Sequence, residues 1–119
     1  MNKILLVGLG GAIGAILRYG LSFLPIKMNF PVATFLTNVI GALLIGIVVG
    51  LFEKSRISSD MTLFLKTGVC GGFTTFSTFS LESLQLFENG QYMIGTIYMI
   101  VSIVGCLLGV YIGRFISMR

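Results

Sequence analysis

The feature that most constrains this chain is a series of four long apolar segments joined by short connections. A membrane-spanning helix needs about 20 mainly apolar residues, and each segment reaches that length. In hydrocarbon every backbone polar group must find a partner, which an α-helix provides within one segment. The sequence therefore predicts an all-α membrane protein with a single transmembrane domain, residues 1–119. Its four expected helices cover approximately residues 4–24, 30–52, 61–87 and 92–116.

The composition agrees with a membrane protein. Charged residues make up 10% of the chain, against roughly 25% in soluble domains. Hydrophobic residues make up 55%, and the mean hydropathy is +1.02. A soluble domain of this size could not bury so much apolar surface. The net charge of +4 is modest and forms no lysine- or arginine-rich run, so we expect a lipid bilayer as partner and no nucleic acid.

Turn signals separate the segments. Pro25 and Pro31 bracket the first connection, and residues 88–90 (Glu-Asn-Gly) mark the third. The second connection, residues 53–60, offers three candidate N-caps for the following helix: Ser58, Ser59 and Asp60.

The basic residues are distributed unevenly between the two sides. Four spans place both ends of the chain on one side of the membrane. Most basic residues lie on or near that side: Lys3, Lys54, Arg56, Lys66, Arg114 and Arg119. Lys27, with Arg18 as a further candidate, lies on the other. The positive-inside rule therefore predicts cytoplasmic ends.

Residues 68–80 are the least helix-like part of the third segment. The adjacent Gly71 and Gly72 weaken a helix there. Hydroxyl residues and phenylalanines alternate around and after them: Phe73, Thr74, Thr75, Phe76, Ser77, Thr78, Phe79 and Ser80. A chain loosens its helix at membrane depth only where the freed groups meet protein, an ion or water. We therefore predict that the third helix is broken mid-membrane and that this break is the functional centre.

Glycines on the first and fourth segments predict close helix packing. The glycines concerned are Gly10, Gly11, Gly14, Gly105, Gly109 and Gly113. With Arg18 and Tyr19, those of the first segment favour a retained helix over a cleaved signal peptide. Four thin helices leave little room for an internal path, which favours at least a dimer. We expect Arg18 to extend to the interface or to pair with a carbonyl or a glutamate.

Asn38 lies near the middle of the second segment, with Thr34 one turn earlier on the same face. An amide in hydrocarbon needs a hydrogen-bond partner. Two interpretations stay open. Asn38 could form an interhelical hydrogen bond worth about 1 kcal/mol, or it could be a donor that lines a polar pathway.

Phe76 and Phe79 share a face if the helix resumes after the break. They could be a core aromatic pair, or their positive ring edges could face an anion. Hydroxyl donors lie between the rings and on the fourth segment: Ser77, Thr78, Tyr98 and Ser102. Neutral donors with no fixed lysine or arginine at the centre suit a small anion that must both enter and leave.

Other residues carry weaker signals. Glu82 is expected at the interface or paired with an arginine, with a proton or cation carrier as the alternative. Carbonyls freed between Gly71 and Thr74 could bind Na⁺ if two chains meet there. Cys70 and Cys106 are expected to be packing residues. The sequence contains no histidine and offers no nucleophile–base pair or metal-ligand cluster, so we predict that it is not an enzyme.

Taken together, these motifs resemble the Fluc family of fluoride channels, also called CrcB proteins. The first two matches are Gly11-x-x-Gly14-x-x-x-Arg18-Tyr19 and Thr34-x-x-x-Asn38-x-x-Gly41. The third match, Gly71-Gly72-Phe-Thr74-Thr75-Phe76-Ser77-Thr78-Phe79, is highly specific, whereas Tyr98 and Ser102 match more loosely. The similarity covers essentially the whole chain.

The resemblance implies a dual-topology homodimer of two antiparallel subunits in the bacterial plasma membrane. Two pores near the subunit interface would let fluoride leave the cytoplasm passively. The implied pathway residues are Thr34, Asn38, Phe76, Ser77, Thr78, Phe79, Tyr98 and Ser102, with Glu82 at the end of the track. Backbone oxygens of Gly71 and Thr74 from both subunits would hold a structural Na⁺ that is not transported. The charge asymmetry leaves a paralogous partner of opposite bias as an alternative second subunit.

Two other functions compete with this interpretation. A proton-coupled small-molecule exporter of the small multidrug-resistance type needs an exchangeable carboxylate deep in the membrane. Glu82 is the one candidate, and it lies near a helix end. A non-transporting bundle is the third possibility, but a scaffold has no need for a broken, hydroxyl-rich helix.

Overall fold

The computed structural model describes residues 2–26 and 28–119, and its elements are helical. The long helices are α1 (Lys3–Leu21), α2 (Val32–Glu53) and α6 (Tyr92–Ser117). Between α2 and α6 lie four shorter pieces: α3 (Ser59–Thr62), the π-helix η1 (Leu63–Cys70), α4 (Gly71–Phe73) and α5 (Phe76–Glu88). No strand occurs in the residues that the structure describes, and the predicted all-α class is confirmed.

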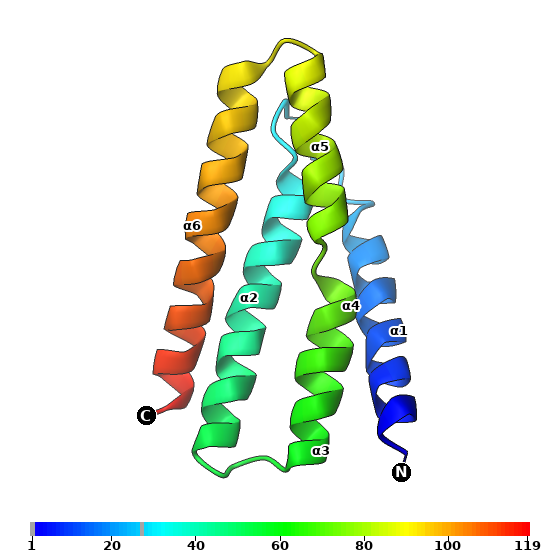
Figure 1. Cartoon of the computed structure of the whole chain (residues 1–119), viewed down its shortest axis with the longest axis vertical. Coiled ribbons are helices and arrows are strands. Elements are labelled where there is room, and N and C mark those ends of the chain that lie inside the picture. Colours follow the sequence, from blue (N-terminus) through cyan, green and yellow to red (C-terminus); the bar gives the residue numbers. More distant parts are fainter. Residues whose placement is uncertain (1, 27) are drawn as a thin grey trace.

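Three helices are long and apolar enough to cross a membrane: α1, α2 and α6, with 19, 22 and 26 residues. The sequence predicts four. The third apolar segment contains no single helix of that length, because η1 and the non-helical Thr74 and Thr75 divide it. Its pieces nevertheless follow one another along the bundle, from α3 at one end to α5 at the other (Figure 1).

Local side-chain chemistry sets several helix ends. The Oδ1 atom of Asn2 accepts a hydrogen bond from the Ile4 N–H at 2.8 Å and caps α1. Of the three candidate caps in the second connection, Ser58 is the one used, since its Oγ accepts from the Met61 N–H at 3.1 Å. The turn expected at residues 88–90 is confirmed by Gly90, which has a φ of +79°.

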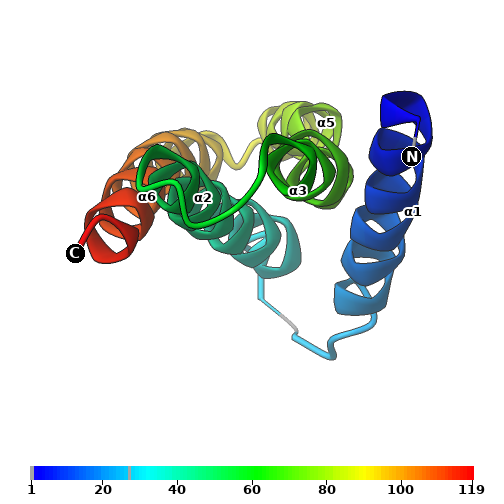
Figure 2. The same cartoon turned by 90° about the horizontal axis from the view of Figure 1, so that it is seen from below.

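The bundle is built from two contacting pairs. α2 packs along α6, and α1 packs against η1 and α4. Viewed from below, α1 and α6 lie on opposite sides, with α2 and the third segment between them (Figure 2). Both chain ends lie at the same end of the bundle (Figure 1). The break between α4 and α5 is therefore flanked by α1 on one side and α2 on the other.

Close packing at glycine is confirmed for most of the predicted positions. A Cβ on Gly14 would collide with the Val69 carbonyl oxygen and with the Phe73 nitrogen, and two glycines of α6 approach the α2 backbone similarly. Gly8 and Gly20 meet no atom within 4 Å, so not every glycine serves a contact. Because the close contacts lie within one chain, they do not by themselves argue for a second subunit.

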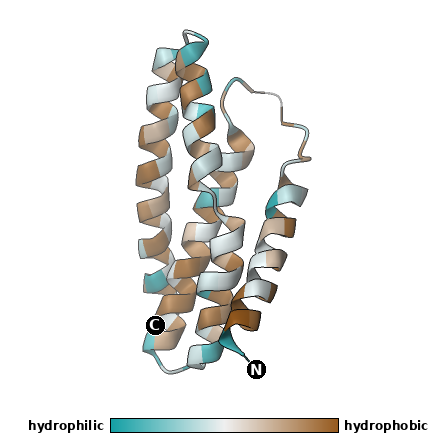
Figure 3. Ribbon diagram, turned by 45° about the vertical axis from the view of Figure 1, so that its right-hand side comes forward, coloured by the Kyte–Doolittle hydropathy of each residue, from teal (hydrophilic) through white to brown (hydrophobic). Residues whose placement is uncertain are grey.

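Many large apolar side chains of α1 and α6 are exposed. Hydrophobic residues predominate along the ribbon of both helices (Figure 3). Ile4 is 77% exposed, Ile16 68% and Leu107 68%. Soluble monomers rarely expose apolar surface on this scale, whereas a bilayer solvates it. The buried core is correspondingly small and centres on Phe79, Leu86 and Tyr98.

Candidate functional site

The third segment is interrupted at Thr74 and Thr75. Helix α4 ends at Phe73, both threonines have extended backbone with ψ values of 155° and 119°, and α5 begins at Phe76. The interruption thus follows the Gly71-Gly72 pair, where the sequence analysis placed the weakened helix. Both glycines are helical, and a Cβ on Gly72 would collide with the α1 backbone. Gly72 serves close contact with α1, whereas a Cβ on Gly71 would meet only the Lys66 carbonyl oxygen at 3.9 Å, and neither glycine opens the chain.

Asn38 of α2 holds the interruption open. Its Nδ2 donates to the Thr75 carbonyl oxygen at 3.0 Å, and its Oδ1 accepts from the Thr75 N–H at 2.8 Å. One side-chain amide therefore satisfies both polar groups of a non-helical residue. The interhelical bond is thus present, and because Nδ2 carries two hydrogens, one remains available to a further acceptor.

Thr75 also begins α5. Its Oγ1 accepts a hydrogen bond from the Thr78 N–H at 3.1 Å and lies 3.1 Å from Thr78 Oγ1 and 3.3 Å from Ser77 Oγ. The three hydroxyls form one connected cluster at the helix N-terminus. The sequence analysis did not single out Thr75. Threonine is nevertheless a preferred N-cap residue, because its hydroxyl can accept from the N–H three residues later, here that of Thr78.

Arg18 supports the interruption from the α1 side. Its Nε donates to the Gly72 carbonyl oxygen at 3.2 Å, and the residue is half-buried. The expectation that Arg18 pairs with a carbonyl is confirmed. Helix α1 therefore contributes a side chain to the end of α4, and α2 contributes one to the backbone between α4 and α5.

An aromatic row extends from the interruption along α5 to α6. The rings of Phe76 and Phe79 have centroids 5.5 Å apart, and those of Phe79 and Tyr98 5.1 Å apart. Phe76 is 78% exposed, whereas Phe79 and Tyr98 are buried. The Tyr98 hydroxyl donates to Glu82 Oε1 at 3.2 Å, so the row ends at a carboxylate that has no arginine within 4 Å in the described residues.

A groove of about 490 Å³ runs beside the interruption. Four of the predicted pathway residues line it, namely Asn38, Phe76, Phe79 and Ser102, and so do both residues of the predicted cation site, Gly71 and Thr74. Ser102 Oγ is buried and is the one such side-chain polar atom without a hydrogen-bond partner in the described part of the chain. An unsatisfied hydroxyl at a groove is a donor ready for a ligand.

The other predicted pathway residues lie outside the groove lining. Thr34 is buried in α2, Tyr98 is fully buried behind Phe79, and Ser77 and Thr78 belong to the hydroxyl cluster at the start of α5. The groove is also lined by a residue that the sequence analysis counted only toward the orientation of the chain in the membrane. Lys66 of η1 lines it, four residues before Cys70.

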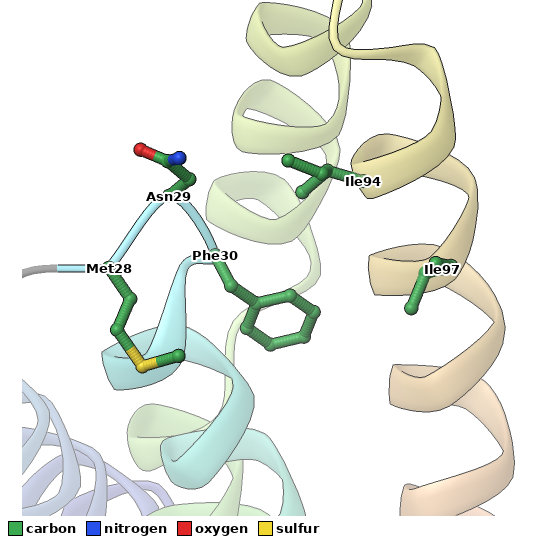
Figure 4. A pocket seen from close by; sticks show the side chains of 5 residues that line it. All are labelled: Met28, Asn29, Phe30, Ile94 and Ile97. Atoms are coloured by element: carbon green, nitrogen blue, oxygen red, sulfur yellow. The ribbon is translucent and has the colours of Figure 1, made fainter.

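A second hollow, of about 670 Å³, lies near the first connection and is lined by Met28, Asn29, Phe30, Ile94 and Ile97 (Figure 4). The Phe30 ring meets the Tyr98 ring edge-on, with centroids 5.1 Å apart and planes at 87°. Tyr98 therefore contacts one residue of each hollow, Phe79 and Phe30. Phe30 was missed because its contact depends on how the first connection folds back.

Comparison with known proteins places this geometry in a family. A model of CrcB-like proteins, described as camphor resistance (CrcB), matches residues 5–114. The chain belongs to the CrcB family. The match spans every helix described above, including the interruption, and it confirms the resemblance seen in the sequence motifs.

Individual CrcB relatives are similar over nearly their full length. A protein of Phocaeicola vulgatus is 45% identical over 120 residues, covering 98% of this chain and 99% of its own. One from Methanococcus aeolicus is 40% identical over 119 residues, covering 99% and 97%. One from Methanococcus maripaludis is 42% identical over 119 residues, covering 99% and 98%. Each of these relatives is named a fluoride-specific ion channel, FluC.

Proposed function

We propose that this chain forms a fluoride-selective channel through which fluoride leaves the cytoplasm passively. Export across the bacterial plasma membrane would limit fluoride toxicity. The structural observation that carries the proposal is the unpartnered, buried Ser102 Oγ at a groove shared with Asn38 and Phe76. The full-length relatives named fluoride-specific channels support the same ion.

Fluoride accepts hydrogen bonds strongly, so removing its water requires several donors. Asn38 has one free amide hydrogen, Ser102 has an unused hydroxyl, and the Thr75–Thr78 cluster adds further hydroxyls. Helix α5 also begins at the interruption, and its first N–H groups and positive dipole end favour an anion there. Ring edges of Phe76 and Phe79 extend the donor surface without a permanent charge. Such weak, multiple sites allow entry and exit.

The third segment would cross the membrane as a broken fourth span. Thr74 and Thr75 would lie near mid-membrane, where an unsatisfied peptide group costs several kcal/mol. The two hydrogen bonds between Asn38 and the Thr75 backbone, and the one that Arg18 donates to Gly72, support this placement, because they satisfy backbone groups that water would otherwise serve.

We further propose an antiparallel, dual-topology dimer with two fluoride pathways near the subunit interface. One chain leaves the groove open along its length and leaves Phe76 78% exposed. A second copy, or a paralogous subunit, would cover this face. The resulting shielding would exclude water and strengthen each donor–fluoride contact.

The backbone oxygens of Gly71 and Thr74 fit a structural Na⁺ shared by two subunits. The Thr75 N–H is bonded to Asn38 and the Thr78 N–H to Thr75 Oγ1, so neither reaches the carbonyl four residues earlier. Within the described residues no hydrogen bond reaches either carbonyl oxygen. Hard cations take such oxygens as ligands, and two chains would supply four. The ion would hold the subunits together without being transported.

The alternative of a proton-coupled exporter is not favoured by the named relatives. Glu82 would be its exchangeable carboxylate. In a channel, Glu82→Gln should still allow fluoride efflux without a proton gradient. In a proton-coupled exporter, the same change would abolish all coupled transport.

The direct test is fluoride efflux from liposomes that hold the purified protein, read with a fluoride electrode, with chloride measured in parallel. We expect fast fluoride efflux, no chloride loss and no dependence on a proton gradient. Equal chloride and fluoride loss, or efflux that stops when the proton gradient is removed, would contradict the proposal.

A further inference from the structure

Lys66 is the one charged residue that lines the groove. It lies in the apolar run Leu63-Phe-Leu-Lys66-Thr-Gly-Val-Cys70, which forms the π-helix η1. A π-helix bonds each residue to the one five positions earlier, so Lys66 lies above Cys70 and Gly71. Both of those residues also line the groove. Lys66 therefore lies on the same side of the segment as the residues that precede the interruption.

The Lys66 ammonium has no carboxylate within 4 Å among the residues that the structure describes. The salt bridge found there joins Arg114 to Glu53, and the carboxylate nearest the aromatic row, Glu82, accepts from Tyr98. Arg18 donates to the Gly72 carbonyl from the α1 side. The charge of Lys66 is thus not neutralised by a carboxylate of its own chain, and within that one chain the residue is exposed.

We propose that Lys66 recruits anions to the groove and so raises the fluoride concentration at the donors of Asn38 and Ser102. This inference rests on the proposed channel function and assigns a residue to its first step. Nine residues separate Lys66 from Thr75, a rise on the order of 10 Å, which is within the screening length at low salt. A cleft lined by one sign of charge raises the local concentration of the opposite ion.

Lys66 can attract an anion without binding it permanently. A flexible four-carbon stem carries its charge, so the ammonium can move with the ion and release it at the donors. The groove-lining donors Asn38 and Ser102 are neutral, and they carry the selectivity. Lys66 therefore affects how often an ion arrives and leaves the choice of ion to the donors.

The test compares initial fluoride efflux rates of the wild type, Lys66→Gln and Lys66→Arg in liposomes, over a range of fluoride concentrations. Each is measured in about 0.01 M and about 1 M salt of an impermeant anion, where the screening length falls from about 30 Å to about 3 Å. The matched control is Lys54→Gln, because Lys54 is exposed at the end of α2 and does not line the groove.

At low salt we expect Lys66→Gln to reduce the rate at subsaturating fluoride by roughly threefold to fivefold, with a higher half-saturating concentration. The difference should fall below about twofold at high salt, and Lys66→Arg and Lys54→Gln should match the wild type. Equal rates for Lys66→Gln and wild type at low salt, or an equal loss in Lys54→Gln, would overturn the role of Lys66 alone. A wild type that passes no fluoride would overturn the channel function as well.

Discussion

At the scale of single residues, Asn38 shows how narrowly the chemistry is determined. Its amide donates to one atom of Thr75 and accepts from another. Only an amide side chain offers both functions in this arrangement. A carboxylate keeps the acceptor and loses the donor, and an apolar side chain loses both.

We expect Asn38→Asp to abolish fluoride efflux. The carboxylate would face the Thr75 carbonyl oxygen and would place a negative charge beside the pathway, which repels the ion. The lost bond should also cost about 1–3 kcal/mol of unfolding free energy. Efflux and the thermal unfolding midpoint in detergent measure both effects. Asn89→Asp, in an exposed turn, is the control, and an unchanged Asn38→Asp rate would contradict the assignment.

Phe76 and Phe79 should differ when each is changed to isoleucine. Both changes remove a ring edge and should reduce efflux at least tenfold. Phe79 is buried against Tyr98, so Phe79→Ile should also lower stability, on the order of 1–2 kcal/mol. Phe76 is exposed within one chain, so Phe76→Ile should change the stability of the single chain by less than about 0.5 kcal/mol, and a larger loss would indicate burial against a second subunit. Phe52→Ile, which replaces a partly exposed ring outside the groove, serves as control, and equal efflux in all three variants would refute a role for the rings.

At the scale of elements, the third segment shows what the sequence can and cannot predict. Its apolar length, hydroxyl content and aromatic spacing identified the segment as the functional centre and placed four pathway residues at one groove. The position of the interruption was expected at Gly71-Gly72 because glycine weakens helices. It falls at Thr74 and Thr75, because Asn38 of another helix binds the Thr75 backbone there. A pattern within one segment cannot reveal a partner 37 residues away.

The π-helix and the contacts of Phe30 were also beyond the sequence. Residues 63–70 carry no motif that distinguishes a π-helix from an α-helix, so the sequence predicts an ordinary helix there. Phe30 lies in a connection, and periodicity predicts nothing about how a connection folds back. In contrast, the Arg18–carbonyl bond was expected, because a cation in an apolar span has few possible partners.

The α1 contact makes a prediction of its own. Gly14→Ala would force a Cβ against the Val69 carbonyl and the Phe73 nitrogen, and we expect it to lower the unfolding free energy by about 1–3 kcal/mol. Gly8→Ala meets no atom within 4 Å and should be neutral or stabilising by up to about 1 kcal/mol. Thermal unfolding in detergent compares the pair. If Gly14→Ala were as stable as Gly8→Ala, the close contact of α1 with α4 would be wrong.

At the scale of the whole molecule, one chain lines its groove without closing it. The outer faces of α1 and α6 are apolar, and the groove, which is lined by α2, the third segment and α6, is open on one side. The two connections that the structure describes fully, after α2 and after α5, lie at opposite ends of the bundle (Figure 1). A cysteine at each of them can therefore report which end faces outward.

We expect dual insertion to appear in labelling of intact cells. In a chain with Cys70 and Cys106 replaced by alanine, Lys54→Cys and Asn89→Cys mark the two ends. A membrane-impermeant maleimide should label about half of each variant if subunits insert both ways. Complete labelling of one variant and none of the other would establish a single orientation. That result would favour a paralogous partner of opposite charge bias.

The pair of hydrogen bonds between Asn38 and Thr75 also fixes the axial position of α2 relative to the third segment. Because these bonds hold α2 and the third segment in register, the loop between Glu53 and Ser58 is not needed to set their relative axial position. Lengthening that loop by a residue should leave every contact in place. One residue inserted in α2 between Asn38 and Glu53 would instead rotate its lower half by about 100° and separate it from α6. The length of the loop after Glu53 can therefore vary, whereas the length of α2 between Asn38 and Glu53 cannot.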